Sequence, residues 1–312
     1  MRARSKNFKK EKVPQMKYCF IVNPKAGKGQ SVDSVCADVK RICEEREVDY
    51  DLFISECIGD TKDHVAKLAA EGSEVCFIAC GGDGTLNEVV SGLLAGGHTT
   101  PVGYIPAGST NDFAASLKLP NNIMQAAQDI LEGQPITYDV GKFGDRYFCY
   151  VASFGAFTKT SYAMPQSVKN ALGHTAYVLG GISELSQIRN EHIRMEIDGE
   201  VVEDDFLFGA ICNSTSIGGI LTLPPNRVDM GDGVFEVMLI RAPRNLTELT
   251  ECILSVQSQS YNCGMITFRS ARSIRVTADP NMPWTLDGER SDGAAQIAVK
   301  NLHHAIRLMR KG

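Results

Sequence analysis

The first half of the chain alternates short apolar runs with stretches in which apolar residues recur at helical spacing. The apolar runs predict strands at Tyr18–Val22, Val48–Ile54, Val75–Ala79 and Pro101–Ile105. The helical spacing predicts a helix with the face Val32, Val35, Cys36, Val39, Ile42 and Cys43, and further helices at Lys62–Ala70, Asn111–Leu117 and Ile123–Leu131. Strands that alternate with helices are typical of a parallel sheet with crossover helices.

After Asp139 the pattern changes to longer strand-like runs around one helical stretch, Val168–Gln187. The predicted strands are Arg146–Phe154, Ile193–Ile197, Glu200–Cys212, Val234–Ile240, Met265–Phe268 and Ser273–Thr277. The last run, Gln296–Met309, favours two strands around Lys300–Asn301 over a helix, because its apolar residues alternate. We therefore expect a basic arm (1–15), an α/β domain (16–139) and a mostly antiparallel β-domain (140–312) whose last strands can return to the first domain.

Composition narrows the class of protein. A chain of 312 residues with 43% hydrophobic and 22% charged residues suits two globular domains, and no run of about 18 apolar residues predicts a membrane span. The basic N-terminus lacks the apolar segment of a secretory signal, and the net charge of −5 argues against a nucleic-acid partner, so a cytoplasmic protein is expected. The ten scattered cysteines suggest buried thiols, and the six histidines lack zinc-ligand spacing, so no transition-metal site is expected.

The most informative motif is the glycine cluster from Gly81 to Glu88, which follows a predicted buried strand and begins a helix. Three glycines in four positions let backbone N–H groups approach a phosphate, and the helix dipole adds to the attraction. Thr85 and Glu88 have the spacing of a capping box. The carboxylate of Asp83 would repel a phosphate unless a cation lay between them, which suggests a Mg²⁺-nucleotide.

Two other polar turns follow predicted strands. Asn23–Gly29 follows the first strand, and Pro106–Phe113 follows the fourth and begins a helix that Ser109 or Thr110 could cap. Asp112 supplies a second carboxylate for the same cation. Because ligands of parallel sheets bind at the carboxyl ends of the strands, we expect these turns to converge on one site.

These motifs together resemble the diacylglycerol kinase catalytic superfamily, and most of all its soluble bacterial lipid kinases. Five elements occur in the family's order: Asn23-Pro24-x-x-Gly27, the Gly81–Glu88 cluster, Pro106-x-Gly-Ser-x-Asn-Asp-Phe113, Asp232-Gly233 and Leu286-Asp287-Gly288-Glu289. The NAD kinase and phosphofructokinase relatives share the glycine cluster alone. The resemblance implies an N-terminal α/β domain with a parallel sheet, like that of NAD kinase and phosphofructokinase, followed by a mostly antiparallel C-terminal β-sandwich.

The resemblance also implies site residues. ATP is expected to lie against Asn23, Pro24, Lys25, Ala26, Gly27, Ser55, Gly81, Gly82, Asp83, Gly84, Thr85, Leu86, Asn87, Ser109, Asn111 and Asp112, where Ser55 and Ser109 replace the family's usual threonines. Asp287 resembles the catalytic base, with Glu289 as the alternative. Asp232 resembles a ligand of a structural Mg²⁺, completed by backbone carbonyls near Asp229 and Val234.

The implied function is a Mg²⁺- and ATP-dependent lipid kinase that converts diacylglycerol to phosphatidic acid. Such an enzyme would contact the inner face of the membrane transiently, through apolar segments such as Ser153–Met164, Gly173–Gly181 and Ser216–Leu223, and a homodimer is expected by resemblance. Trp284, near Asp287, could wall the site, although a lone tryptophan is more often in the core. The alternatives are a soluble NAD kinase-like enzyme and a non-catalytic nucleotide- or lipid-binding regulator.

Overall fold

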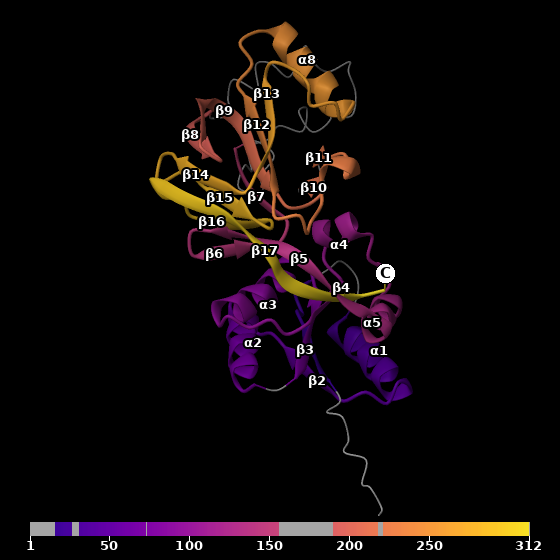
Figure 1. The fold of residues 1–312 in the computed structure, drawn as a ribbon. Helices are drawn as coiled ribbons and strands as arrows, with labels where there is room; N and C mark the ends of the chain where they lie inside the picture. Colours follow the sequence, from indigo (N-terminus) through magenta and orange to yellow (C-terminus); the bar gives the residue numbers. More distant parts are fainter. Residues whose placement is uncertain (1–15, 27–30, 73, 156–189, 218–220, 312) are drawn as a thin grey trace, which may run out of the picture.

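The computed structural model describes residues 16–26, 31–72, 74–155, 190–217 and 221–311. These residues form two lobes (Figure 1). The predicted arm, Gly27 and the predicted helix Val168–Gln187 lie outside the described residues, as do Gly173–Gly181 and parts of the other two proposed lipid-contact segments. Within the described parts of the chain, no helix combines the length and the apolar character needed to cross a bilayer.

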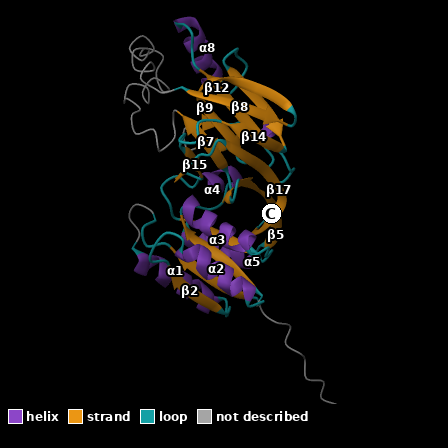
Figure 2. Cartoon of the chain, turned by 90° about the vertical axis from the view of Figure 1, so that its left-hand side faces the viewer, coloured by secondary structure: helices purple, strands orange, loops and turns teal. Residues whose placement is uncertain are grey.

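The N-terminal lobe is a parallel sheet in the order β2-β1-β3-β4, with helices on both faces (Figure 2). Its elements are β1 Lys17–Val22, α1 Val32–Glu45, β2 Tyr50–Ile54, α2 Asp60–Ala70, β3 Val75–Gly81, α3 Asp83–Ala95, β4 Val102–Pro106, α4 Asp112–Leu117 and α5 Ile123–Glu132. The predicted α/β fold is confirmed.

The alternation of side chains along β3 explains why both faces need helices. All seven residues of β3 are buried. Phe77 and Ala79 pack with the apolar faces of α2 and α3, whereas Cys76, Ile78 and Cys80 pack with those of α1 and α5. A strand covered on both faces is a continuous apolar run, as expected for a parallel sheet.

The C-terminal lobe is built almost entirely of antiparallel strands. Its elements are β5 Gln134–Phe143, β6 Arg146–Phe148, β7 Val151–Gly155, β8 Glu191–Ile197, β9 Glu200–Cys212, β10 Ser216–Ile217, β11 Leu221–Thr222, η2 Pro225–Arg227, β12 Phe235–Arg241, α8 Leu246–Gln257, β13 Ile266–Ala271, β14 Ser273–Thr277, β15 Trp284–Leu286, β16 Glu289–Ser291 and β17 Gln296–Arg310. Trp284 is fully buried between Phe143 and Phe154, so its role is in the core.

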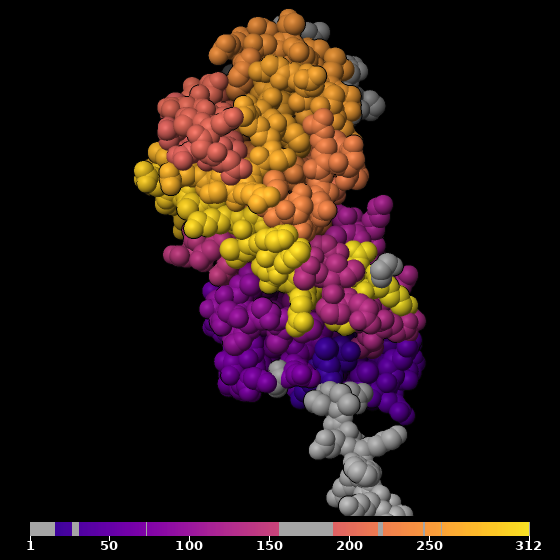
Figure 3. Space-filling view, viewed as in Figure 1, coloured from indigo at the N-terminus to yellow at the C-terminus, as the bar shows by residue number. Residues whose placement is uncertain are grey.

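The last strand, β17, links the two lobes. It pairs with β14 and β5 in the C-terminal lobe and, through Leu308 and Val102, runs parallel to β4 in the N-terminal lobe. Figure 3 shows its residues, in yellow, at the junction of the lobes. One hydrogen-bonded network of 15 strands therefore extends through both lobes.

Several elements differ from the sequence-based expectations. Strands β5, β10, β11, β15 and β16 were not predicted, and β5 crosses the expected domain boundary after residue 139. The predicted strand Arg146–Phe154 is divided into β6 and β7 at Cys149 and Tyr150, whose N–H groups bond to a side chain instead of a neighbouring strand. The predicted turn at Lys300–Asn301 is wrong, because β17 continues through it and is irregular only further on. Helix α8 was not predicted, although Asn245 caps it by accepting the Glu248 N–H at 2.9 Å.

Candidate active site

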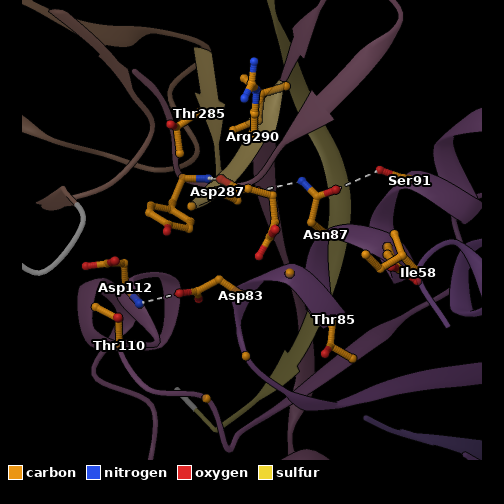
Figure 4. A pocket seen from close by; sticks show the side chains of 18 of the residues that line it. Ile58, Asp83, Thr85, Asn87, Ser91, Thr110, Asp112, Thr285, Asp287 and Arg290 are labelled. Carbon is orange, nitrogen blue, oxygen red and sulfur yellow. Dashed lines mark hydrogen bonds between the residues drawn. The ribbon is translucent and has the colours of Figure 1, made fainter. Parts of the chain in front are cut away.

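The turns after β1, β3 and β4 lie together at the carboxyl edge of the parallel sheet and form one wall of a cavity of about 1000 Å³. The other wall comes from β6, β7 and the β15–β16 hairpin of the C-terminal lobe, so the cavity lies between the lobes (Figure 4). The predicted site residues that line it are Asn23, Lys25, Ala26, Ser55, Gly82, Asp83, Gly84, Thr85, Asn87, Ser109, Asn111, Asp112, Asp287 and Glu289.

A few predicted residues do not line the cavity. Pro24 and Gly81 are not among its lining residues, and Gly27 lies outside the described part of the chain. Leu86 is wholly buried and packs in the core between the sheet and α3. Its prediction as an ATP contact is therefore corrected, because the apolar residue of the motif faces the sheet and not the loop.

The glycine loop and the third turn are in direct backbone contact. The Ala107 N–H donates to the Gly81 carbonyl at 2.8 Å, and a Cβ on Gly108 would lie 2.4 Å from the Gly82 Cα. Helix α3 begins directly after Gly82, which supplies no side-chain cap. The first turn of α3 therefore presents the backbone geometry that binds phosphates.

The predicted capping box is wrong, because α3 begins at Asp83 and Thr85 is already inside its first turn. The Thr85 hydroxyl instead accepts a hydrogen bond from the Asn23 amide at 3.1 Å, and the Glu88 carboxylate accepts the Gly59 N–H at 3.1 Å. Thr85 thus holds the loop after β1 next to α3, and Glu88 holds the loop before α2 there.

Asp83 is a buried carboxylate that holds the start of α4. It accepts the N–H groups of Asp112 at 2.9 Å and Phe113 at 3.3 Å, and the Tyr104 hydroxyl at 3.2 Å. Burial, with a smaller contribution from the charges of Asp287 and Asp112, raises the pKa of Asp83 to about 7, although the two backbone hydrogen bonds oppose the shift. Keeping Asp83 ionised in this cavity therefore costs free energy that a cation would offset.

The third turn is held by Asn111 and not by the predicted caps Ser109 and Thr110. Asn111 is the N-cap residue of α4 with a φ of 54°, and its side chain bonds to both the N–H and the carbonyl of Gly108. Asp112 accepts a hydrogen bond from the Ser216 hydroxyl of the C-terminal lobe. The carboxylate of Asp112 thus joins the two lobes at the cavity wall.

Asp287 lies in the tight turn between β15 and β16, with a φ of 48°, and its carboxylate accepts four hydrogen bonds. One oxygen accepts the Asn87 amide at 2.7 Å and the Cys149 N–H at 2.6 Å, and the other accepts the N–H groups of Tyr150 at 2.9 Å and Val151 at 3.1 Å. Burial raises the pKa of Asp287 and these bonds lower it. Since an ionised carboxylate has roughly four lone-pair sites, all are occupied.

Glu289, two residues later, is exposed and faces the glycine loop. Its Oε1 lies 3.7 Å from the position that a Cβ on Gly84 would take. Glu289 therefore brings the C-terminal lobe next to the first turn of α3.

The predicted structural metal ligands lie in one exposed turn. Asp229 accepts the Gly231 N–H and Asp232 accepts the Val234 N–H, both at 2.9 Å. Burial, together with the charge of Asp232, raises the pKa of nearby Glu236 to about 8, which shows that carboxylates gather here. An all-oxygen donor set of this kind fits Mg²⁺.

Three basic residues outside the quoted sequence motifs also line the cavity. They are Lys62 on α2, Arg146 on β6 and Arg290 on β16. Arg290 directly follows the Asp-Gly-Glu motif, which is a local signal, whereas Arg146 is far from every motif and only the fold brings it here. Their charges suit an anionic ligand.

Comparisons with known proteins agree with the fold. The model of the diacylglycerol kinase catalytic domain matches residues 17–143, and that of the YegS C-terminal NAD kinase beta sandwich-like domain matches residues 153–310. A crystal structure of a diacylglycerol kinase from Bacillus anthracis Sterne superposes with a TM-score of 0.71 at 22% identity, over 95% of this chain and 97% of that one, which shows the shared fold.

Curated relatives extend the similarity over most of the chain. The diacylglycerol kinase of Bacillus subtilis strain 168 is 30% identical over 271 residues, which are 86% of this chain and 88% of the relative. That of Staphylococcus saprophyticus is 32% identical with the same coverage. The resemblance inferred from the motifs is confirmed: the chain belongs to the diacylglycerol kinase family and is a lipid kinase, a phosphotransferase with an alcohol acceptor.

Proposed function

We propose that the protein transfers the γ-phosphoryl group of Mg²⁺-ATP to the free hydroxyl of diacylglycerol, giving phosphatidic acid. The observation that carries this proposal is the convergence, in one cavity between the lobes, of the α3 N-terminus with Asp83, Asp112 and Glu289. The printed names of the curated relatives support diacylglycerol as the acceptor.

The nucleotide phosphates would lie against the first turn of α3, with Lys25 and Lys62 at the same wall. Backbone N–H groups and lysine charges are the groups that hold phosphates in phosphoryl-transfer enzymes. The exposed Arg290 on the opposite lobe can reach the transferred group from the other side.

The acidic residues of the cavity fit Mg²⁺. Among the described residues, the acidic side chains of the cavity do not bring three ligand atoms within 4.8 Å of one another, so they form no closed cage. Mg²⁺ usually keeps several waters and binds through one or two carboxylates together with substrate phosphates. Asp83 and Asp112 would hold the ion, which neutralises phosphate charge, and the Asp229–Val234 turn would hold a second, structural ion.

The two carboxylates of the Asp-Gly-Glu motif have different roles in this proposal. Asp287 is the first candidate base by resemblance, but its four hydrogen bonds leave no lone pair for a substrate proton. We assign it to positioning the β15–β16 turn. Glu289 is exposed at the loop and would orient the lipid hydroxyl and accept its proton late in the transfer, since an alcohol is too weak an acid to ionise beforehand.

With diacylglycerol as the acceptor, the enzyme must contact a membrane. The hydroxyl of diacylglycerol lies at the bilayer surface, so the cavity must open toward that surface while the protein is bound. We propose a cytoplasmic enzyme that contacts the inner face of the membrane transiently, acts without nucleic acid and forms a homodimer.

The test is the transfer of labelled γ-phosphate from Mg²⁺-ATP to a lipid panel in mixed micelles. Wild type is expected to label diacylglycerol, and Glu289→Gln to lose at least about 100-fold in kcat with little change in the KM for ATP. Glu203→Gln, on the exposed face of β9, is the matched control. Labelling of NAD in place of lipid would show the NAD kinase-like alternative, and ATP binding without any turnover would show a regulator.

A further inference from the structure

An irregular segment of β17 places two neighbouring histidines beside a buried carboxylate. β17 pairs regularly with β5 as far as Leu302 and resumes at Ile306, so His303 and His304 lie in a bulge. His304 has a φ of 53°, a left-handed conformation that costs free energy outside glycine. The bulge faces Asp139 on β5, whose side chain is 0% exposed. The backbone strain at His304 must be offset by stabilising interactions of the surrounding residues.

Two segments converge on Asp139 of β5. His303 Nδ1 lies 3.0 Å from Asp139 Oδ1, and the His304 N–H donates to the same oxygen at 2.7 Å. The Gly233 N–H donates to the other oxygen at 2.6 Å, and His304 Nε2 lies 3.0 Å from the Gly231 carbonyl oxygen. The cluster therefore joins β5, β17 and the Asp229–Val234 turn.

The buried charge of Asp139 has no strong counter-ion. A buried carboxylate is stable only when it is paired and hydrogen-bonded. Among the described residues, no lysine or arginine forms an ion pair with it, and its ion-pair partner is His303. The exposed carboxylates of Asp229 and Asp232 add further negative charge to the same region.

The donor atoms are spaced for a metal ion. One carboxylate oxygen of Asp139 and one nitrogen of each histidine all lie within 4.8 Å of one another. A tetrahedral site with bonds of about 2.0–2.1 Å has ligand–ligand separations of about 3.3 Å. The two contacts of 3.0 Å, from Asp139 to His303 and from His304 to the Gly231 oxygen, are already close to that edge length.

We propose that Asp139, His303 and His304 bind a divalent transition metal of the zinc type, with the Gly231 carbonyl oxygen as fourth ligand. Imidazole nitrogens with a carboxylate suit Zn²⁺, whereas Mg²⁺ prefers oxygen ligands. The N–H groups of Gly233 and His304 orient the carboxylate from outside the ligand set. The His303 side chain is 52% exposed, so an ion can enter from solvent.

This site differs from the Mg²⁺ site expected at Asp229, Asp232 and Val234 in its donors and its metal. It lies where β17 passes from one lobe to the other (Figure 1). A bound ion would link the β17 bulge to β5 and to the Asp229–Val234 turn. It would therefore make the connection between the two lobes more rigid.

The test is a titration of the full-length, metal-stripped protein with Co²⁺, whose visible absorption reports tetrahedral coordination, followed by competition with Zn²⁺. We expect one equivalent to bind and Zn²⁺ to displace it. His303→Asn and His304→Asn should each weaken binding at least about tenfold. His192→Asn is the control, because His192 also lies 2.9 Å from a carboxylate oxygen, that of Asp205, but belongs to no group of three possible metal ligands among the described residues.

Four results would overturn the proposal. The first is no saturable Co²⁺ band in the wild type, and the second is equal affinity in the wild type and both histidine variants. The third is displacement of Co²⁺ by equimolar Mg²⁺, which needs only the wild type and so remains decisive if a variant does not fold. An Asp232→Asn variant that loses binding as fully as the histidine variants would assign the ion to the turn instead.

Discussion

At the scale of single residues, the carboxylate of Asp287 shows how the two lobes share the site. Its backbone N–H donors come from three successive residues of the C-terminal lobe, and its side-chain donor, Asn87, comes from α3 of the N-terminal lobe. Asn87 also donates to the Tyr147 carbonyl at 2.9 Å. The sequence motif suggests Asn87 as a nucleotide ligand, and these contacts lead us to propose that it also positions Asp287.

This role gives a prediction for Asn87. Asn87→Asp would place two carboxylates against each other where the amide now lies 2.7 Å from Asp287, so kcat should fall by roughly 100-fold. Asn87→Ala only removes a hydrogen-bond donor, so its kcat should fall by roughly tenfold. The KM for ATP should change less than about threefold. Ser91→Ala, which removes only the hydroxyl that bonds to Asn87 at 3.2 Å, is the control. A raised KM for ATP at unchanged kcat would instead show a nucleotide ligand.

Asp83 gives a prediction on the pH dependence of stability. Its pKa is raised from 3.8 to about 7, chiefly by burial, so the folded protein holds this proton more tightly than the unfolded chain does. The stabilisation is complete below about pH 4 and is lost as the pH rises through about 7. For the ligand-free protein, the free energy of unfolding should fall over this range, by at most about 4 kcal/mol from this group.

Urea unfolding between pH 4 and pH 8 tests this prediction, because Asp83→Asn should flatten the decline. Glu236, whose pKa is raised to about 8, contributes a slope of the same sign that persists in the variant, and Glu236→Gln removes that part separately. Parallel pH profiles for wild type and Asp83→Asn would refute the assigned burial cost.

The candidate site was predicted well where its residues are local in sequence. The glycine loop and the turn before α4 each follow a strand, so their side chains reach one edge of the sheet by the rule for parallel sheets. The partners of Asp287 are backbone N–H groups, which carry no sequence signal. Asp139 and His303 are separated by 164 positions, and spacing alone could not bring them together.

At the scale of elements, the glycine loop and the third turn approach each other so closely that their contact leaves no room for a side chain. A Cβ on Gly108 would lie 2.4 Å from the Gly82 Cα and 2.7 Å from the Asn111 side chain, so the two loops would have to separate. Gly108→Ala should lower stability by roughly 1–3 kcal/mol and weaken ATP binding at least tenfold. Gly264→Ala, which meets nothing within 4 Å, is the control. Unchanged ATP affinity in Gly108→Ala would show that the loop contact is dispensable.

The helices and strands that the sequence predicted are those with strong periodicity, such as α1 and β3. The errors fall where tertiary contacts override the local pattern. The run Arg146–Phe154 has strand character throughout, yet Asp287 takes the N–H groups at its centre. The run Gln296–Met309 contains polar residues in its middle, and only its partners on both sides, β14 and β5, keep it a single strand.

At the scale of the whole molecule, the order of the strands makes the lobes interdependent. The three turns of the N-terminal lobe that line the cavity precede residue 113, but the sheet that carries them is completed by β17. The cavity takes one wall from each lobe. The connection between lobes through β17 is therefore part of what holds the site together.

We expect the two lobes to unfold together. Leu308 is fully buried beside β4 and packs with Val102 and Tyr104, so Leu308→Ala should destabilise the protein by about 2–5 kcal/mol. Calorimetry should show one transition, shifted to lower temperature, and the ATP-induced rise in melting temperature should follow the same transition. Leu254→Ala, on the exposed side of α8 at 51% exposure, should shift the transition little. The opposite result would be two transitions, of which the one that responds to ATP is unaffected by Leu308→Ala. It would show that the N-terminal lobe folds without β17 and that β17 adds little to its stability.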